Sequence, residues 1–242
     1  MQILTIHSEF ESVKKLGFPT FLNDNEINKE KIVLRWGKGD DFEIFDFVLN
    51  EGPSIKSNID KESCLYLLSE VVNVPQIFAH NQPKNKLVVL KNSHHSGGLG
   101  FNISIASKKR KIPPGKYCTE FIDAIAEYRV WFCCKQTIQA QRIKENSKDS
   151  NICRSQWGYK FVRHNEHLHQ QTLIAAEKIG LDVGAADILI DKDNKEYFLE
   201  LNSAPTIDDD ILIEFFKKNL NDNRNNNYEN KNLHRYSKFD FA

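Results

Sequence analysis

Gly180–Ile207 reads GLDVGAADILIDKDNKEYFLELNSAPTI, and this stretch decides the fold. It contains two apolar, strand-compatible runs, Ala185–Ile190 and Glu196–Leu201, separated by the polar turn Asp191–Lys195. Two runs of this kind joined by a short polar turn predict a β-hairpin. We therefore expect two neighbouring antiparallel strands near the end of the chain.

Three oxygen-bearing side chains fall on one face of this hairpin. Glu200 and Asn202 are two residues apart on the second strand and so project to the same side, and pairing across the turn brings Asp187 near Glu200. Such oxygen ligands suit Mg²⁺, which keeps waters and substrate phosphates in its shell. The alternative is a solvated polar face, but unpaired carboxylates are expensive to bury in apolar runs, and we prefer a metal site.

The hairpin sequence resembles the metal-binding end of the ATP-grasp superfamily, in its RimK-like and phage-type branch. The resemblance rests on Gly-Leu-Asp-x-Gly-Ala-x-Asp-Ile-Leu from Gly180 and on Tyr-Phe-Leu-Glu-Leu-Asn-Ser-Ala-Pro from Tyr197. It implies an α+β fold in which two lobes with antiparallel sheets hold ATP between them. It also implies ATP and Mg²⁺ as cofactors, with Mn²⁺ as an alternative ion, and chemistry that joins a carboxylate to an amine through an acyl phosphate.

Composition narrows the class of protein. The 242 residues are enough for one large domain or two closely joined lobes, and 33 basic residues balance 33 acidic ones, so net charge gives no reason to expect nucleic acid or a membrane as partner. The five cysteines have no CxxC spacing and are odd in number, which favours reduced thiols. No apolar run is long enough to span a bilayer, and the first residues lack signal-peptide features. We expect a cytoplasmic protein; the sequence does not indicate its oligomeric state.

The predicted organisation has three parts: residues 1–57 form a short N-terminal α/β lobe, residues 58–220 the ATP-grasp domain, and residues 221–242 a polar tail. The segment Asp208–Leu220 predicts a final helix. Residues 221–232 are strongly Asn-rich, which predicts disorder or an exposed loop.

One predicted helix carries the first candidate nucleotide ligand. Asn58–Asp60 followed by Lys-Glu-Ser-Cys-Leu-Tyr-Leu-Leu indicates a capped amphipathic helix that starts near Lys61. By the resemblance, a lysine at this position reaches the nucleotide phosphates. A solvated first-turn lysine is an equally good interpretation of the residues alone.

A glycine-rich turn follows, between the strand-like runs Lys86–Leu90 and Phe101–Ala106. Its glycines would let backbone N–H groups approach phosphate oxygens, although a plain turn is the alternative. The resemblance identifies this segment as a lid over ATP. Its candidate nucleotide ligands are Lys91, Ser96, Gly97, Gly98 and Gly100.

Three more strand-like runs come next: Tyr117–Ile122, Glu127–Cys134 and Thr137–Ile143. By the resemblance, Glu120, Phe121 and Ile122 present backbone groups to the adenine edge. Glu127 then faces the ribose or the metal.

The cationic candidates lie on and after these strands. Arg142 and Lys144 share a strand face by period two and could meet phosphate oxygens, and the resemblance directs Arg129 toward the nucleotide. These three are the candidate catalytic residues, and Arg154 is the candidate for binding an acidic substrate. The alternative is that they line the exposed face of a half-buried sheet.

The preferred function is an Mg²⁺- and ATP-dependent carboxylate–amine ligase that releases ADP and phosphate. Its partners would be small-molecule or peptide carboxylates and amines. A catalytically silent nucleotide-binding or interaction protein is one alternative. A metal-dependent nuclease is less favoured, because such cores place a lysine two residues after the glutamate, where this chain has Asn202.

Overall fold

The computed structural model describes residues 2–6, 11–19, 31–37, 47–94, 102–105, 110–144 and 157–237; for some of these, among them Lys144 and residues 224–237, it describes the backbone alone. The helices are α1 (Glu11–Lys14), α2 (Gly52–Ile59), α3 (Lys61–Leu68), α4 (Glu166–Ile179) and α5 (Asp210–Ser237). The strands are β1 (Gln2–Ile6), β2 (Lys31–Arg35), β3 (Phe47–Leu49), β4 (Ile77–Phe78), β5 (Asn81–Gln82), β6 (Leu87–Asn92), β7 (Asn102–Ile105), β8 (Arg110–Lys111), β9 (Lys116–Glu120), β10 (Ala124–Cys133), β11 (Gln136–Lys144), β12 (Trp157–Phe161), β13 (Val183–Asp191) and β14 (Glu196–Asn202).

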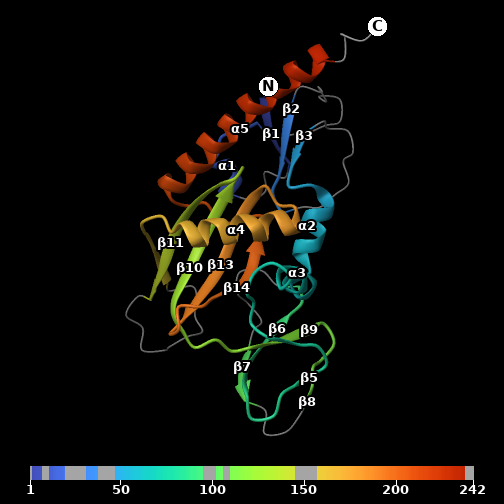
Figure 1. The fold of residues 1–242 in the computed structure, drawn as a ribbon, viewed down its shortest axis with the longest axis vertical. Coiled ribbons are helices and arrows are strands. Elements are labelled where there is room, and N and C mark those ends of the chain that lie inside the picture. The colour runs from blue at the N-terminus through green and yellow to red at the C-terminus, as the bar shows by residue number, and fades with distance from the viewer. Residues whose placement is uncertain are drawn as a thin grey trace.

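A five-stranded antiparallel sheet with strand order β12-β11-β10-β13-β14 is the centre of the molecule. Figure 1 shows helix α4 across this sheet, the parallel β1–β2–β3 sheet beside α5 at one end, and a second antiparallel sheet at the other end. This second sheet has the order β4-β9-β6-β7. A short antiparallel pair, β5–β8, accompanies it. The chain is therefore an α+β protein with two large antiparallel sheets, as the resemblance implied.

The predicted hairpin is confirmed. Strands β13 and β14 pair in antiparallel fashion with Asp187 opposite Glu200, and the register shifts by one residue just beyond this pair. The strand–turn–strand prediction around the glycine-rich turn is confirmed at its flanks, because β6 pairs with β7; residues 95–100 lie outside the described residues. The three strands that were predicted after it are β9, β10 and β11, and the last two form a hairpin.

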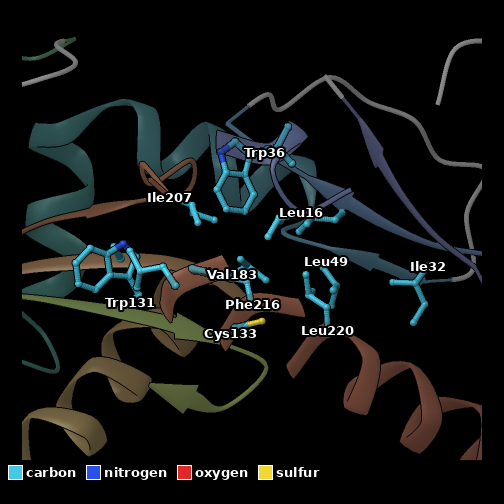
Figure 2. Packing of buried hydrophobic residues seen from close by; sticks show 14 of the residues in the cluster. Leu16, Ile32, Trp36, Leu49, Trp131, Cys133, Val183, Ile207, Phe216 and Leu220 are labelled. Carbon is cyan, nitrogen blue, oxygen red and sulfur yellow. The ribbon is translucent and has the colours of Figure 1, made fainter. Parts of the chain in front are cut away.

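The two faces of the central sheet pack against different elements. One face meets helices α2, α3 and α4 in a core that includes Val130, Phe132 and Ile188. The other face meets the N-terminal lobe and α5 in a second core, which Figure 2 shows with Trp36, Trp131 and Phe216 among its members. Alternation along each strand sends neighbouring residues to opposite cores, so burial on both faces holds the register of the sheet.

The predicted start of one helix is confirmed, and a second helix ends before a glycine. Helix α3 is N-capped by Asp60, whose carboxylate accepts from the N–H groups of Glu62 and Ser63. Helix α4 ends at Gly180, which adopts a left-handed conformation with φ of 81°. A Cβ at Gly180 would also lie 2.5 Å from the Ser54 hydroxyl, so both backbone and space require glycine there.

One buried side chain joins the N-terminal lobe to the central sheet. Asn50 is fully buried with φ of 61°, and its Oδ1 accepts from the N–H groups of Asp182 and Val183, both at 2.9 Å. Its Nδ2 donates to the Val183 carbonyl at 2.8 Å and to the Arg35 carbonyl at 3.3 Å. Its own N–H donates to the Asp182 carboxylate. One amide side chain thus satisfies the backbone where β13 begins and ties it to the end of β2.

The C-terminal prediction is wrong in one respect. Helix α5 runs from Asp210 to Ser237, so residues 221–232 continue the helix instead of forming a loop or a disordered tail. Asparagine is only moderately unfavourable in a helix, and a run already anchored by Phe216 and Leu220 can propagate at little cost per residue.

The structure also contains two elements that were not predicted, and it bears on the predictions about cysteines and membrane spans. Strand β3 and helix α2 were not predicted, and α2 spans Gly52–Ile59, across the expected boundary between residues 57 and 58. The described cysteines, Cys64, Cys118, Cys133 and Cys134, are free thiols, and Cys153 lies outside the described residues. Among the described residues no helix is long and apolar enough to cross a membrane.

Replacing Asn50 by alanine should destabilise the protein strongly. The change leaves the buried N–H of Val183 without its acceptor at about 1–3 kcal/mol and the partly buried N–H of Asp182 at the low end of that range, and it places alanine in a left-handed conformation at about 1–2 kcal/mol. We expect a fall in unfolding free energy of about 3–5 kcal/mol in chemical denaturation. Asn194→Ala is the matched control, because Asn194 has the same φ of 61° but is exposed, and it should lose only about 1 kcal/mol. Equal losses in the two variants would show that the hydrogen bonds of Asn50 contribute nothing.

Candidate functional site

One face of the central sheet changes from apolar to charged along its strands. On β10, Cys133 and Trp131 lie in the core under the N-terminal lobe, and Arg129, two residues before Trp131, lies beyond it. On β13, Val183 lies in the same core, whereas Asp187 is paired with Arg129 on the neighbouring strand. The alternation that buries one half of this face therefore lines up ionic side chains on the other half.

The centre of the charged half is the ion pair between Arg129 and Asp187. The Arg129 Nε lies 3.0 Å from Asp187 Oδ1, as a charge contact without hydrogen-bond alignment, and Nη2 donates to Oδ2 at 3.3 Å. The Asp187 side chain is only 1% exposed. Burial opposes the charge of Arg129 and tends to lower its pKa, but Asp187, Tyr159 and Glu200 together outweigh burial and raise the pKa of Arg129 above its usual value. Arg129 is therefore charged.

A tyrosine links this pair to a second one. The Tyr159 hydroxyl accepts from Arg129 Nη1 at 3.1 Å and from Arg142 Nη2 at 2.5 Å. Arg142 also donates through Nη1 to the Glu127 carboxylate, and both side chains are nearly buried. Four strands contribute to this chain of contacts, from β12 to β13, so the predicted residues Arg129, Arg142, Glu127 and Asp187 form one network.

The other predicted metal ligands lie next to Asp187 on the edge strand. Glu200 is its direct partner in the β13–β14 ladder, and Asn202 donates to the Glu200 carboxylate through Nδ2 at 3.3 Å. The two carboxylates and the amide thus occupy neighbouring positions. Opposite Asn202 on β13 is Ala185, which is fully buried.

Lys61 contacts the same strand from the other side. It is 9% exposed, and its Nζ donates to the Leu201 carbonyl at 2.7 Å, between the predicted ligands Glu200 and Asn202. The contact of Lys61 with nucleotide phosphates stays a prediction. Its contact in this structure is with the backbone.

The remaining nucleotide-binding candidates lie on the second antiparallel sheet. Lys91 on β6 lies over the ring of Tyr117, with Nζ 5.9 Å from the centroid. Glu120 on β9 pairs with Lys86 at 2.9 Å. The N–H of Glu120 donates to the Gln76 carbonyl and that of Phe121 to the Leu87 carbonyl, so these two amides are used within the protein.

Some predictions are left untested by the structure. Ser96, Gly97, Gly98, Gly100 and Arg154 lie outside the described residues. Lys144 is described by its backbone alone, on β11 opposite Trp157. Ile122 follows β9, immediately after Phe121.

The residues present fit a divalent cation that arrives with other ligands. Two carboxylates and an amide supply oxygen ligands but cannot fill an octahedral shell. Among the described residues no group of three or more His, Cys, Asp or Glu side chains could hold a metal ion. Because Arg129 already balances Asp187, an added cation needs further negative charge, such as phosphate oxygens would supply.

This architecture belongs to a known class: the α+β chain, with its two antiparallel sheets, has the ATP-grasp fold. The solved structure of the macrocyclase MdnC from Microcystis aeruginosa MRC, bound with precursor peptide MdnA, matches 90% of this chain and 99% of its own, with a TM-score of 0.59 and 12% identity. D-alanine–D-alanine ligase from Bacillus anthracis complexed with ATP matches 94% of this chain and 99% of its own, with a TM-score of 0.61 and 13% identity.

A third similar structure is the ATP-grasp ligase PsnB complexed with minimal precursor, Mg and ADP, which matches 90% of this chain and 96% of its own, with a TM-score of 0.61 and 12% identity. No protein-family model matches the sequence, and no curated protein matches it. At these identities the likeness concerns the fold.

Two residues of the site were missed by sequence reasoning. Tyr159 lies in a segment that was not predicted as a strand, although Trp157, Tyr159 and Phe161 alternate with period two and would have supported one. Asn58, which donates to the Leu201 carbonyl at 2.8 Å, was interpreted only as part of a helix start. A side chain that contacts a residue 143 positions away leaves no local pattern in the sequence.

Removing Arg129 alone should be more harmful than removing both members of its ion pair. Arg129→Met leaves the buried Asp187 without its counter-charge, and we expect a loss of about 3–5 kcal/mol of unfolding free energy. In Arg129→Met/Asp187→Asn the uncompensated charge is gone, and about half or more of the loss should be recovered. Chemical denaturation of the two variants and of Asp187→Asn completes the cycle. A double variant less stable than Arg129→Met would contradict this account of the pair.

Proposed function

We propose that the protein is an Mg²⁺-dependent ATP-binding ligase that joins a carboxylate to an amine and releases ADP and phosphate. The observation that carries the proposal is the facing pair of Asp187 and Glu200 on one end of a sheet face that also carries Arg129 and Arg142. The ATP-grasp fold supports it, because the similar structures include ligases. The motifs from Gly180 and Tyr197 favour the RimK-like, phage-type branch of that fold.

The chemistry needs two displacements. A carboxylate oxygen of the acid substrate attacks the γ-phosphorus of ATP, the bond to the β-phosphate oxygen breaks, and ADP leaves. The amine nitrogen then attacks the acyl carbon, the carbon–oxygen bond to phosphate breaks, inorganic phosphate leaves, and the nitrogen loses a proton to solvent. Both steps require positioning and charge stabilisation, without a nucleophilic side chain of the protein.

The residues of the site have separate roles in this scheme. Asp187, Glu200 and Asn202 would hold Mg²⁺, which would neutralise the negative charge of the phosphates. Arg129 and Arg142 have several N–H donors each, and Tyr159 keeps their guanidinium groups in fixed positions. We infer that Arg142 and Lys144 serve the transferred phosphoryl group and that Arg154 serves the acid substrate.

The adenine would be bound at the turn after β9. Because the N–H groups of Glu120 and Phe121 donate within the protein, the carbonyl groups of this turn and the backbone of Ile122 are the better candidates to contact the base. Lys91 and the segment Ser96–Gly100 would cover the phosphates, and Glu127 would lie near the ribose or the metal. The glycine-rich segment would act as a lid that keeps water from the acyl phosphate.

The substrates are proposed as a class only. MdnC and PsnB were solved with precursor peptides, and the Bacillus anthracis enzyme is a ligase of D-alanine. These structures support amino-acid or peptide carboxylates and amines as candidates for this chain. A screen of ADP release over amino acids, polyamines and peptides would identify the acceptor.

A catalytically silent nucleotide-binding protein is the second candidate, and one observation favours it. Arg129 contacts both oxygens of Asp187, where a metal ion would have to bind. If Arg129 cannot move away, the site would bind nucleotide without organising Mg²⁺ for transfer. Metal-dependent ATP binding without turnover on any acceptor would support this reading over the ligase.

Magnesium should bind tightly only in the presence of ATP. In the ligand-free protein Asp187 is balanced by Arg129, and the three ligands leave half of an octahedral shell to water. Calorimetry should therefore show Mg²⁺ uptake that is at least about tenfold stronger once ATP contributes phosphate oxygens. Glu200→Gln should remove most of the metal-dependent gain in ATP affinity, and Asp193→Asn, at the exposed tip of the same hairpin, should not. Tight uptake of Mg²⁺ by the ATP-free protein would contradict this proposal.

Turnover should yield ADP and phosphate, and Lys144 should affect the rate more than ATP binding. If its charge is used mainly in the transition state, Lys144→Ala should lower turnover by about a hundredfold or more with ATP affinity nearly unchanged. Lys160→Ala on β12 is the matched control, since Lys160 is exposed and alternates with Tyr159 to the other face. Product analysis with an active acceptor would show whether turnover yields ADP and phosphate. Release of pyrophosphate, or normal turnover by Lys144→Ala, would exclude this mechanism.

A further inference from the structure

The edge of the central sheet at β14 is held by side chains that the function above does not use. Strand β14 is the last strand of the sheet, so its alternate backbone groups point away from β13 and need partners elsewhere. The Phe198 N–H donates to the Asn73 carbonyl at 2.8 Å. The Leu201 carbonyl accepts two hydrogen bonds, from Asn58 Nδ2 at 2.8 Å and from Lys61 Nζ at 2.7 Å.

The two donors are placed by adjacent helices. Asn58 lies in the last turn of α2, and Lys61 is the first residue of α3, after the capping residue Asp60. Their exposed fractions are 2% and 9%, so neither gains much from water. A buried ammonium and a buried amide that converge on one carbonyl form a strong hydrogen-bonded unit, because either donor would be costly to leave unpaired.

We propose that Asn58 and Lys61 act as a two-donor clamp that fixes the Leu201 peptide group and so positions the metal ligands on either side, Glu200 and Asn202. The metal role of those two ligands rests on the function proposed above. The Leu201 side chain is fully buried against the helices, and its carbonyl is held from the edge. The backbone at Glu200 and Asn202 cannot rotate far without breaking the two hydrogen bonds to the Leu201 carbonyl.

Lys61 also reaches the second sheet through its backbone. Its N–H donates to the Ser93 carbonyl at 3.0 Å, at the residue that follows β6, and Ser93 is buried. The same residue therefore joins the base of the predicted lid to the predicted metal strand. A shift of the end of β6 would change the hydrogen bond of the Lys61 N–H, and a shift of β14 would change that of its Nζ.

The ammonium group of Lys61 donates to the Leu201 carbonyl and also influences the nearby thiol of Cys64. Burial raises the pKa of Cys64, an effect that Lys61 and Asn58 reduce and Glu200 increases, so the thiol stays neutral. Lys61 therefore lowers the pKa of the Cys64 thiol, whereas Glu200 raises it. As positioning residues, Asn58 and Lys61 would stabilise the ligand geometry without touching the reacting atoms.

Hydrogen exchange in the ATP-free protein tests the clamp by itself. We expect Asn58→Ser and Lys61→Met to raise amide exchange at residues 200–202 by about tenfold, the equivalent of one hydrogen bond, with no change at the Glu196 end of β14. Lys61→Arg keeps a charged donor and should restore slow exchange. Lys178→Met is the matched control, because it removes a lysine that pairs with Glu70 on the surface of the same helical layer. Unchanged exchange at residues 200–202 in both variants would overturn the clamp, whether or not the protein binds ATP.

ATP affinity with Mg²⁺ and with EDTA separates positioning from direct phosphate binding. A clamp predicts that each single variant lowers only the Mg²⁺-dependent affinity, by about tenfold, and that the double variant loses less than the product of both, since they act on one peptide group. If Lys61 instead binds phosphate directly, Lys61→Met weakens ATP equally in EDTA, and Asn58→Ser has no effect; this result would overturn the proposal. A wild type that binds no ATP would reject the proposed function and leave the exchange experiment to decide on the clamp.

Discussion

The ion pair between the buried side chains of Asp187 and Arg129 organises the site. Asp187 lies in a strand that is otherwise packed on both faces, and it is stable there because Arg129 is its cross-strand neighbour. That neighbour is in turn held by Tyr159, and Tyr159 by Arg142. The polar network therefore depends on four neighbouring strands of the sheet, and a change of register by one residue would send each of these charges into the helix-side core.

The N-terminal lobe supports this arrangement from a distance. Its core covers the apolar half of the same sheet face, and Asn50 fixes the point at which β13 begins, four residues before Asp187 enters the site. The lobe is small, but buried hydrogen bonds join it to the central sheet, and Trp36 packs against Phe216 of α5. It therefore has a structural role in addition to any part it takes in binding a substrate.

The sequence predicted the elements whose patterns are local. The β13–β14 hairpin and the cap at Asp60 depend on periodicity and end residues within a few positions, and both are present. Helix α5 was cut short because composition was weighed above the continuity of a helix already begun. Asn50, Asn58 and Tyr159 could not be assigned their contacts, since those contacts join residues far apart in the chain and depend on a strand order that periodicity does not specify.

The closure of the β14 edge has a consequence for association between molecules. An unpaired edge strand offers N–H and C=O groups to any extended segment that can approach it, and it invites aggregation or the addition of a foreign strand. On β14 the outward groups of Phe198 and Leu201 are already bonded to Asn73, Asn58 and Lys61. An incoming chain would have to displace a buried lysine before it could form a ladder there. The strand that carries two of the predicted metal ligands is thus shielded from β-sheet growth, and a peptide that reaches this end of the sheet would have to be recognised through its side chains.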